Sequence, residues 1–294
     1  MDNLILSGQF HLAYLLLVVP SPLNLFRGEY HESNDHHCHQ RRHWEDDDWC
    51  QPGTLLIDAD PQPSVSSFFQ LEYEAPCGFY ELIAQNETNP ERIISRTVIP
   101  NLSVITNNDP HSQLVNMMLQ APDGRIRLKN LISSFSDFDL VIIDTQGTRT
   151  VIQEMAVLAS ELAISPIQPH MLAAREFHRG TGQLFSDLEG FKALGLTIPP
   201  CKIVINMLDQ TADARMIADL IRTNFNQGLF EVVETAIPQA VSFRGAATQG
   251  IPTHRLEYRA PTDRKAPAAL DILRSLAIEL FPEWRERYEA LTAD

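Results

Sequence analysis

Six short apolar runs alternate with helical patterns after residue 53, and this alternation constrains the fold more than any other feature. The runs are TLLIDA (54–59), LSVIT (102–106), DLVIID (139–144), ELAISPI (161–167), KIVIN (202–206) and FEVVETAI (230–237). Helical stretches are predicted at 114–135, 151–160, 173–193, 212–226 and 266–280. Strands that alternate with helices are typical of a parallel sheet covered by helices. We therefore predict an α/β fold: a twisted parallel sheet of six strands with helices on both faces.

The charge and cysteine content limit the classes of function. The chain has 294 residues and a net charge of −15, which disfavours wholesale coating of nucleic acid or of an anionic membrane. The four cysteines, Cys38, Cys50, Cys77 and Cys201, show no framework spacing, so we expect a reducing cytoplasmic setting without structural disulfides. The apolar run at 12–19 is short and lacks a preceding basic region, so we expect a buried segment and not a signal peptide.

Two of the predicted strands end in carboxylates. DLVIID ends at Asp144, in the form of a Walker B element, and LLIDADPQ places Asp58 and Asp60 at the end of another strand. A carboxylate at the carboxyl end of a parallel strand can hold Mg²⁺ beside bound phosphates, although it can also simply cap the next turn. Gly147 could let a backbone N–H approach a γ-phosphate. The sequence therefore indicates a phosphate and magnesium site at this edge of the sheet.

LLIDADPQ resembles the strand after the P-loop in the ParA/MinD family of deviant Walker ATPases. DLVIIDT, AISPIQPHMLAAREF, KIVINMLD and AIPQAVSFRGAATQGIPTHRLEYR follow in the order typical of that family, so the resemblance covers about residues 54–285. It is closer to ParA-type partition proteins than to MinD, because no basic amphipathic helix follows Trp284. The resemblance implies a Rossmann-like P-loop ATPase fold, with ATP and Mg²⁺ as cofactors.

The resemblance also implies roles for individual residues. Asp60 would position the attacking water, and Asp58 and Asp144 would lie on the Mg²⁺ side. Asn206 would contact the adenine edge and Pro238 would belong to the adenine loop, although Asn206 could instead cap a turn. The chain departs from the family at residues 145–147, where Thr-Gln-Gly replaces the usual Thr-Pro-Pro. The family's switch contact after Asp144 is therefore not carried over to this chain.

A basic segment lies between residues 241 and 265, where five basic residues stand against two acidic ones: Arg244, Arg255, Arg259, Arg264 and Lys265. The resemblance implies that an ATP-bound homodimer binds DNA non-specifically here, at the nucleoid, and that a ParB-like partner stimulates hydrolysis. A solvated surface with ordinary ion pairs is the alternative for these residues. Two other functions stay open: a non-catalytic interaction module, and a MinD-like membrane-surface regulator, which the mixed charges of FPEWRERYEALTAD disfavour.

The phosphate-binding loop that the resemblance requires before LLIDAD, KGGxGKT[TS], does not occur in residues 1–53. Its glycines would let backbone N–H groups wrap the phosphates, and its lysines would neutralise their charge. HHCHQRRHWEDDDWC (36–50) stands in this position instead, with four of the ten histidines and two of the four cysteines.

Codons read one nucleotide downstream give another interpretation of residues 36–53. The shifted frame admits IIATKGGIGKTTTGANL, a complete phosphate loop with its strand, and Asn34-Asp35 can yield a start codon. We therefore expect residues 1–53 to be an irregular segment, with 1–33 read from a leader and 34–53 out of frame, ahead of a ParA-like domain at 54–294. We also expect these residues to be poorly ordered and the sheet to lack a central neighbour. The alternative is a zinc site from His36, His37, Cys38, His39, His43 and Cys50, whose spacing matches no standard zinc motif.

Overall fold

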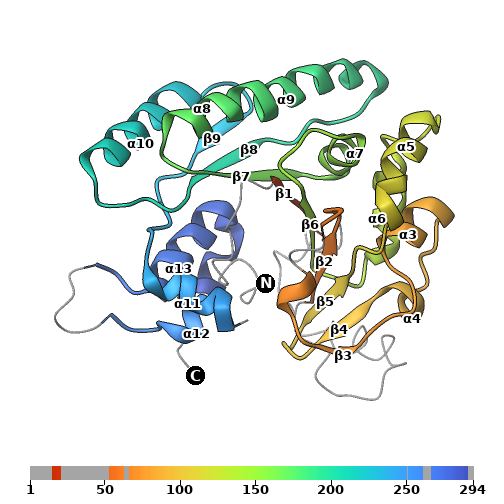
Figure 1. Ribbon diagram of the computed structural model, residues 1–294, viewed down its shortest axis with the longest axis horizontal. Helices are drawn as coiled ribbons and strands as arrows, with labels where there is room; N and C mark the ends of the chain where they lie inside the picture. The colour runs from red at the N-terminus through yellow and green to blue at the C-terminus, as the bar shows by residue number, and fades with distance from the viewer. Residues whose placement is uncertain (1–14, 21–52, 63–65, 250, 261–265, 291–294) are drawn as a thin grey trace.

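The computed structural model describes residues 15–20, 53–62, 66–249, 251–260 and 266–290. They form one sheet of nine strands in the order β3-β4-β5-β2-β6-β1-β7-β8-β9, with helices on both faces (Figure 1). All six predicted strands are present: β2 (Thr54–Asp58), β5 (Leu102–Ile105), β6 (Leu140–Thr145), β7 (Leu162–Ile167), β8 (Cys201–Ile205) and β9 (Phe230–Val232). The predicted α/β fold is confirmed.

These six strands run parallel, as predicted. β2 pairs in parallel with β5 on one side and with β6 on the other, and β7, β8 and β9 form a second parallel group. Every residue of β2 and β6 is buried, as expected of strands covered on both faces. The carboxyl ends of the six strands therefore lie along one edge of the sheet.

The position between β6 and β7 is filled, which corrects the expectation that the sheet lacks a central neighbour. β1 (Leu15–Pro20) lies there and pairs antiparallel with both strands, and Figure 1 shows it in dark red between them. The apolar run at 12–19 thus contributes a strand. The remainder of residues 1–53 lies outside the described residues apart from Gly53, so neither the frame hypothesis nor the zinc alternative is tested there.

Two short strands at the end of the sheet beside β5 were not predicted. β3 (Leu71–Tyr73) pairs antiparallel with β4 (Ser95–Thr97), which pairs antiparallel with β5. Each has only three residues, too few for an alternation of polar and apolar side chains to be recognised. They extend the sheet beyond the parallel strands and do not change the position of the acidic strand ends.

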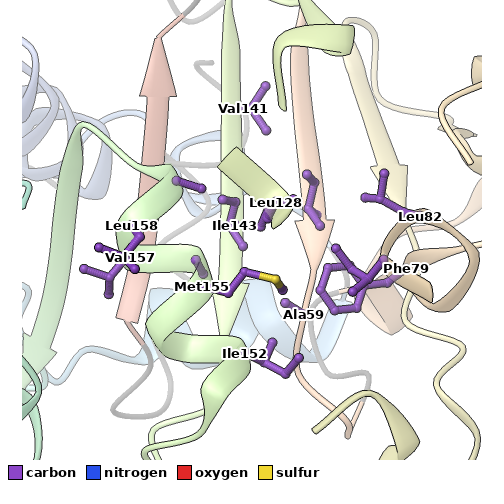
Figure 2. Close-up of a cluster of buried hydrophobic side chains, with 14 of the residues drawn as sticks. Ala59, Phe79, Leu82, Leu128, Val141, Ile143, Ile152, Met155, Val157 and Leu158 are labelled. Atoms are coloured by element: carbon purple, nitrogen blue, oxygen red, sulfur yellow. The ribbon is translucent and has the colours of Figure 1, made fainter. Parts of the chain in front are cut away.

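The helices pack on the two faces of the sheet through separate hydrophobic clusters. On one face, α7 places Ile152, Met155, Val157 and Leu158 beside Ile143 of β6, as Figure 2 shows. On the other face, Leu273 and Leu276 of α13 pack in a cluster with residues of β2 and β6 that point the opposite way. The helices have these bounds: α3 (Phe79–Gln85), α4 (Pro90–Ile93), α5 (Gln113–Gln120), α6 (Arg127–Ile132), α7 (Val151–Ala159), α8 (Met171–Phe177), α9 (Gln183–Leu188), α10 (Ala212–Phe225), α11 (Val241–Gln249), α12 (Thr253–Leu256), α13 (Ala269–Leu280) and α14 (Arg285–Ala290).

The helix predicted over 114–135 is divided into α5 and α6. Pro122 favours an extended conformation at the preceding residue, and Ala121 has a ψ of 133°. The N–H of Gly124 then donates to the carbonyl of Ala121 at 3.1 Å. Proline and glycine in the middle of the apolar pattern therefore end α5 and turn the chain into α6.

The helix predicted over 173–193 runs from α8 to α9 through a π-helical segment, His178–Gly182, and continues into a 3₁₀ segment, Glu189–Leu194. The helices predicted at 151–160, 212–226 and 266–280 correspond to α7, α10 and α13. The helices α3, α4, α11, α12 and α14 were not predicted. α4 and α12 have only four residues each, too few to show a period of 3.6 residues. α11 is as long as α7, but its sequence VSFRGAATQ has few large apolar side chains to mark a period.

Candidate active site

Three buried carboxylates gather where β2 and β6 end. Asp58 and Asp144 are paired neighbours in the parallel ladder, and the backbone N–H of Ala59 donates to the carbonyl of Asp144 at 2.8 Å. The exposed fractions of Asp58, Asp60 and Asp144 are 0%, 3% and 2%. The arrangement predicted from LLIDAD and DLVIID is therefore present, with both strand ends side by side.

Asp58 is held by hydrogen bonds from its own loop. Its Oδ2 accepts from Ser66 twice, from the backbone N–H at 3.0 Å and from Oγ at 2.7 Å. Its Oδ1 accepts from the N–H of Asp60 at 3.2 Å. Asp60 in turn accepts from the N–H of Gln62 at 2.8 Å. The turn after β2 therefore fixes the position of both carboxylates.

Asp144 differs from the other two because one of its oxygens is unsatisfied. Oδ2 of Asp144 is buried and has no hydrogen-bond partner among the described residues. An unpaired buried carboxylate oxygen is costly, and such an atom suits a cation or a donor brought by a ligand. Among the described residues, no three His, Cys, Asp or Glu side chains converge on one point where they could hold a metal. Mg²⁺ commonly takes one or two carboxylates and completes its coordination with phosphates and water.

Burial raises the pKa of all three groups, and repulsion by neighbouring carboxylates adds to the shift at Asp58 and Asp144. Burial, followed by the charges of Asp58 and Asp60, raises the pKa of Asp144 well above its ordinary value. Burial also raises the pKa of Asp58, against the opposing effect of the Ser66 hydrogen bonds, and the pKa of Asp60. A cation between these groups would remove the repulsion and favour the ionised forms.

The segment after Asp144 is tied to α7 and α9. The carbonyl of Gln146 accepts from Nε2 of Gln153 at 3.3 Å. Arg149 forms ion pairs with Glu154 of α7 at 2.9 Å and with Asp187 of α9 at 2.5 Å. Gly147 is exposed between these ties. The loop that departs from the family pattern is thus anchored at both ends, with Gly147 open to solvent.

The two residues assigned to the adenine contact lie in neighbouring segments. Asn206 follows β8 and is buried, and its Oδ1 accepts from the N–H of Met207 at 2.9 Å. Met207 has a φ of 57°, an uncommon left-handed conformation for a residue other than glycine. Leu208 next to it forms a parallel bridge with Pro238. Strand spacing is about 4.8 Å, so Asn206 lies roughly 14 Å along the edge from Asp144, three strand positions away.

Three of the five basic residues lie in the described part of the chain. Arg244 of α11, Arg255 of α12 and Arg259 are all exposed, and Arg259 stacks over the ring of Tyr258 at 5.7 Å. α11 and α12 pack against each other. Arg264 and Lys265 lie outside the described residues. The basic surface is therefore present in part, built on a helical pair.

Comparison with known proteins identifies the fold. A family described as an AAA domain matches residues 52–194, and no curated protein sequence matches the chain. An ATP complex of McdA from Cyanothece superposes with a TM-score of 0.61 at 19% identity, covering 83% of this chain and 87% of that chain. A putative plasmid partition protein from Borrelia burgdorferi bound to AMPPNP gives 0.56 at 18% identity, covering 80% and 88%.

Cobyrinic acid a,c-diamide synthase from Mycobacterium smegmatis with bound ADP and magnesium gives a TM-score of 0.54 at 22% identity, covering 68% of this chain and 78% of that chain. The chain therefore shares the fold of these partition and diamide-synthase structures. This is the fold that the resemblance drawn from LLIDADPQ and DLVIIDT implied, and the AAA-domain match lies over both motifs. No helix in the described part of this chain has the length and apolar content needed to cross a membrane.

The sequence interpretation missed two contributors to the site. Ser66, which holds Asp58, lies in the Ser-rich turn after DADPQ, where the residue type was suggestive but the partner could not be specified. Gln168 after β7 contacts Sδ of Met207 at 3.3 Å and so joins the ends of β7 and β8. Gln168 could have been suspected only from its position directly after the buried strand β7. Among the cysteines, Cys77 and Cys201 are free thiols, and Cys38 and Cys50 lie outside the described residues.

Proposed function

We propose that this chain derives from a ParA-like partition ATPase that binds ATP and Mg²⁺ at the carboxyl edge of the sheet. The observation that carries the proposal is the buried, unsatisfied Oδ2 of Asp144 beside the carboxylates of Asp58 and Asp60. Similar folds bind ATP, AMPPNP, or ADP with magnesium, as the three superposed structures do. The edge from Asp144 to Asn206 suits an extended nucleotide, with its phosphates at the carboxylates and its base near Asn206.

In this proposal each residue has a distinct role. Asp144 and Asp58 hold the Mg²⁺ side of the site, where the cation neutralises phosphate charge when it is bound. Asp60 orients the water that attacks the γ-phosphate in line, and Gly147 offers its backbone N–H to that phosphate. Asn206 and Pro238 frame the adenine. Catalysis of phosphoryl transfer depends mainly on such positioning and charge neutralisation.

The chain as given lacks the groups that would hold the phosphates. A phosphate loop follows a strand whose carboxyl end lies at the site edge, and the position beside Asp144 is that of β1. β1 runs in the opposite direction, with Leu15 opposite Thr145 at the site edge and Pro20 opposite Leu140 at the far edge. β1 therefore ends at the edge of the sheet opposite to Asp58 and Asp144. A strand of this direction does not lead a phosphate loop to Asp144, which supports our proposal that the polypeptide binds ATP poorly. Our proposal that residues 34–53 are a phosphate loop read out of frame is based on the sequence.

We extend the proposal to DNA and to partners by family resemblance. The ATP-bound form would be a homodimer that binds DNA non-specifically at the nucleoid through Arg244, Arg255, Arg259, Arg264 and Lys265, and a ParB-like protein would stimulate hydrolysis. The exposed arginines of α11 and α12 support this surface. A few phosphate contacts give weak binding that weakens further with salt, with dissociation constants of about 10⁻⁴ to 10⁻⁶ M.

A frame-restored chain tests the function. In it, IIATKGGIGKTTTGANL replaces residues 36–52, and hydrolysis of ATP is measured by phosphate release with Mg²⁺. We expect ATP hydrolysis in the restored chain, and a fall of about 10²- to 10⁴-fold in Asp60→Asn with nucleotide binding retained. Lys192→Glu in the exposed 3₁₀ segment serves as the matched control. Failure of the folded, restored chain to bind nucleotide would refute the assigned site, and a DNA sequence without KGGxGKT in the shifted frame would refute its origin.

A further inference from the structure

An open groove lies between α8 and α10, and none of the residues assigned to the nucleotide site lines it. Its volume is about 570 Å³. Ile217, Leu220, Ile221 and Phe225 of α10 form one wall, and Met171 and Ala174 of α8 form part of the other. Ile217 and Ile221 are buried at the base, whereas Met171 and Leu220 are 47% and 44% exposed. The groove therefore has a packed floor and an apolar rim that solvent reaches.

Both walls follow helical spacing, so each is a single helix face. On α10 the lining positions are 217, 220, 221, 224 and 225, and along α8 and its continuation they are 171, 174, 175, 178 and 179. Each set has the pattern i, i+3, i+4, i+7, i+8, which marks one continuous stripe. Two parallel stripes with an open space between them form the kind of surface that receives an amphipathic helix through its apolar face.

The α8 wall carries positive charge that has no partner among the described residues. Arg175 and Arg179 lie one turn apart and form no ion pair or side-chain hydrogen bond with any other described residue, and His178 lies between them. Arg125, Arg127 and Arg149, by contrast, are each paired with a carboxylate. The chain has a net charge of −15, so two arginines on one rim form a local positive site. They favour a ligand that carries negative charge where it meets this rim.

The backbone is also irregular at this wall. The π-helical segment His178–Gly182 carries two of the lining residues, and a side chain at Gly180 would meet nothing within 4 Å. Single-turn π segments inside α-helices are rare and are frequent at functional sites. The methionine at position 171 adds an adaptable contact of the kind used by peptide-binding surfaces.

We propose that the groove between α8 and α10 binds an amphipathic helix of a partner protein. Its apolar side chains would pack between Leu220 and Met171, and its acidic side chains would lie over Arg175 and Arg179. The inference does not depend on nucleotide binding, since no residue of the phosphate or adenine site lines the groove. It specifies the chemistry of the partner: an acidic helix with an apolar stripe.

The test uses three synthetic helical peptides with the same leucine stripe and with glutamate, lysine or glutamine on the flanks. Binding to the full chain is measured by fluorescence anisotropy. We expect saturable binding of the glutamate peptide, at least tenfold weaker in Leu220→Asp. The double variant Arg175→Glu, Arg179→Glu should lose the glutamate peptide and gain the lysine peptide. Leu194→Asp, at a position 74% exposed and outside the groove, should leave binding unchanged. Circular dichroism confirms that each variant is folded.

Three outcomes would overturn the proposal. The first is binding of the glutamate peptide that none of the groove variants weakens, or no binding at all. The second is a dimer, seen by analytical ultracentrifugation, that Leu220→Asp dissociates, which would make the groove an interface between two copies of this chain. The third is binding to vesicles of anionic phospholipid that the double arginine variant abolishes, which would make it a membrane-contacting surface.

Discussion

At the scale of single residues, Asp144 is the carboxylate of the site with a buried oxygen that has no hydrogen-bond partner among the described residues. Its pKa is raised above the ordinary value, so the folded state holds a proton that the unfolded chain releases near pH 4. The free energy of unfolding therefore falls as the pH rises above the unfolded pKa. Asp144→Asn removes this charge, and we expect it to stabilise the fold at pH 7 by about 1–3 kcal/mol. The gain should disappear below pH 4.

Urea unfolding at several pH values measures this effect. Glu74→Gln, at an exposed position after β3, is the matched control and should change stability by less than about 0.5 kcal/mol. Equal destabilisation of Asp144→Asn at every pH would show that the carboxylate is satisfied in a way that the described residues do not reveal.

Ser66 is the second residue whose effect can be measured. Its Oγ and N–H both donate to the buried Asp58. Ser66→Ala leaves one of these bonds, so we expect a loss of about 1.5–3 kcal/mol, the range for a hydrogen bond to a charged group. Thermal unfolding of Ser66→Ala beside Ser134→Ala, an exposed serine in another 3₁₀ segment, gives the comparison. A change in Ser66→Ala no larger than that in Ser134→Ala would contradict the role of Ser66 in holding Asp58.

At the scale of elements, Gly124 decides where α5 ends. A Cβ at this position would lie 2.0 Å from the carbonyl oxygen of Met118, which belongs to the backbone and cannot move aside. Gly124→Ala should therefore destabilise the fold by more than about 1 kcal/mol. At Gly190 a Cβ would meet nothing within 4 Å, so Gly190→Ala should be neutral or stabilising. Chemical denaturation measures the free energy of unfolding of both variants. Equal free energies for Gly124→Ala and Gly190→Ala would contradict the turn after α5.

The same turn shows what could be predicted at this scale and what could not. Apolar side chains identified the long helices correctly. α10 and α13 each bury one stripe against the sheet, and α7 is buried along its whole length. The apolar period continues through Pro122 and Gly124, so it predicted a single helix. In the structure the chain turns at these residues and forms α5 and α6. Elements of three or four residues, such as β3 and α12, depend on tertiary pairing and leave no period to read.

At the scale of the whole molecule, the parallel sheet and its acidic edge were predictable, and its central strand was not. Asp58 and Asp144 come together because parallel strands share a carboxyl edge. The Leu15–Pro20 strand could not be placed from sequence, since a short apolar run fits a strand, a leader or a helix equally. The missing phosphate loop was the reason for expecting a gap, yet the fold fills that position with a strand of opposite direction.

Titration of this chain with ATP and Mg²⁺ by isothermal calorimetry tests the central claim most directly. The claim is that the carboxylate half of a ParA-like nucleotide site is present, while the half that binds phosphates is absent from the polypeptide. We predict no saturable binding of ATP at concentrations up to about 1 mM, the range of a weak complex. The frame-restored chain, titrated in parallel, should bind in the micromolar range. Micromolar affinity in the chain as given would contradict the account.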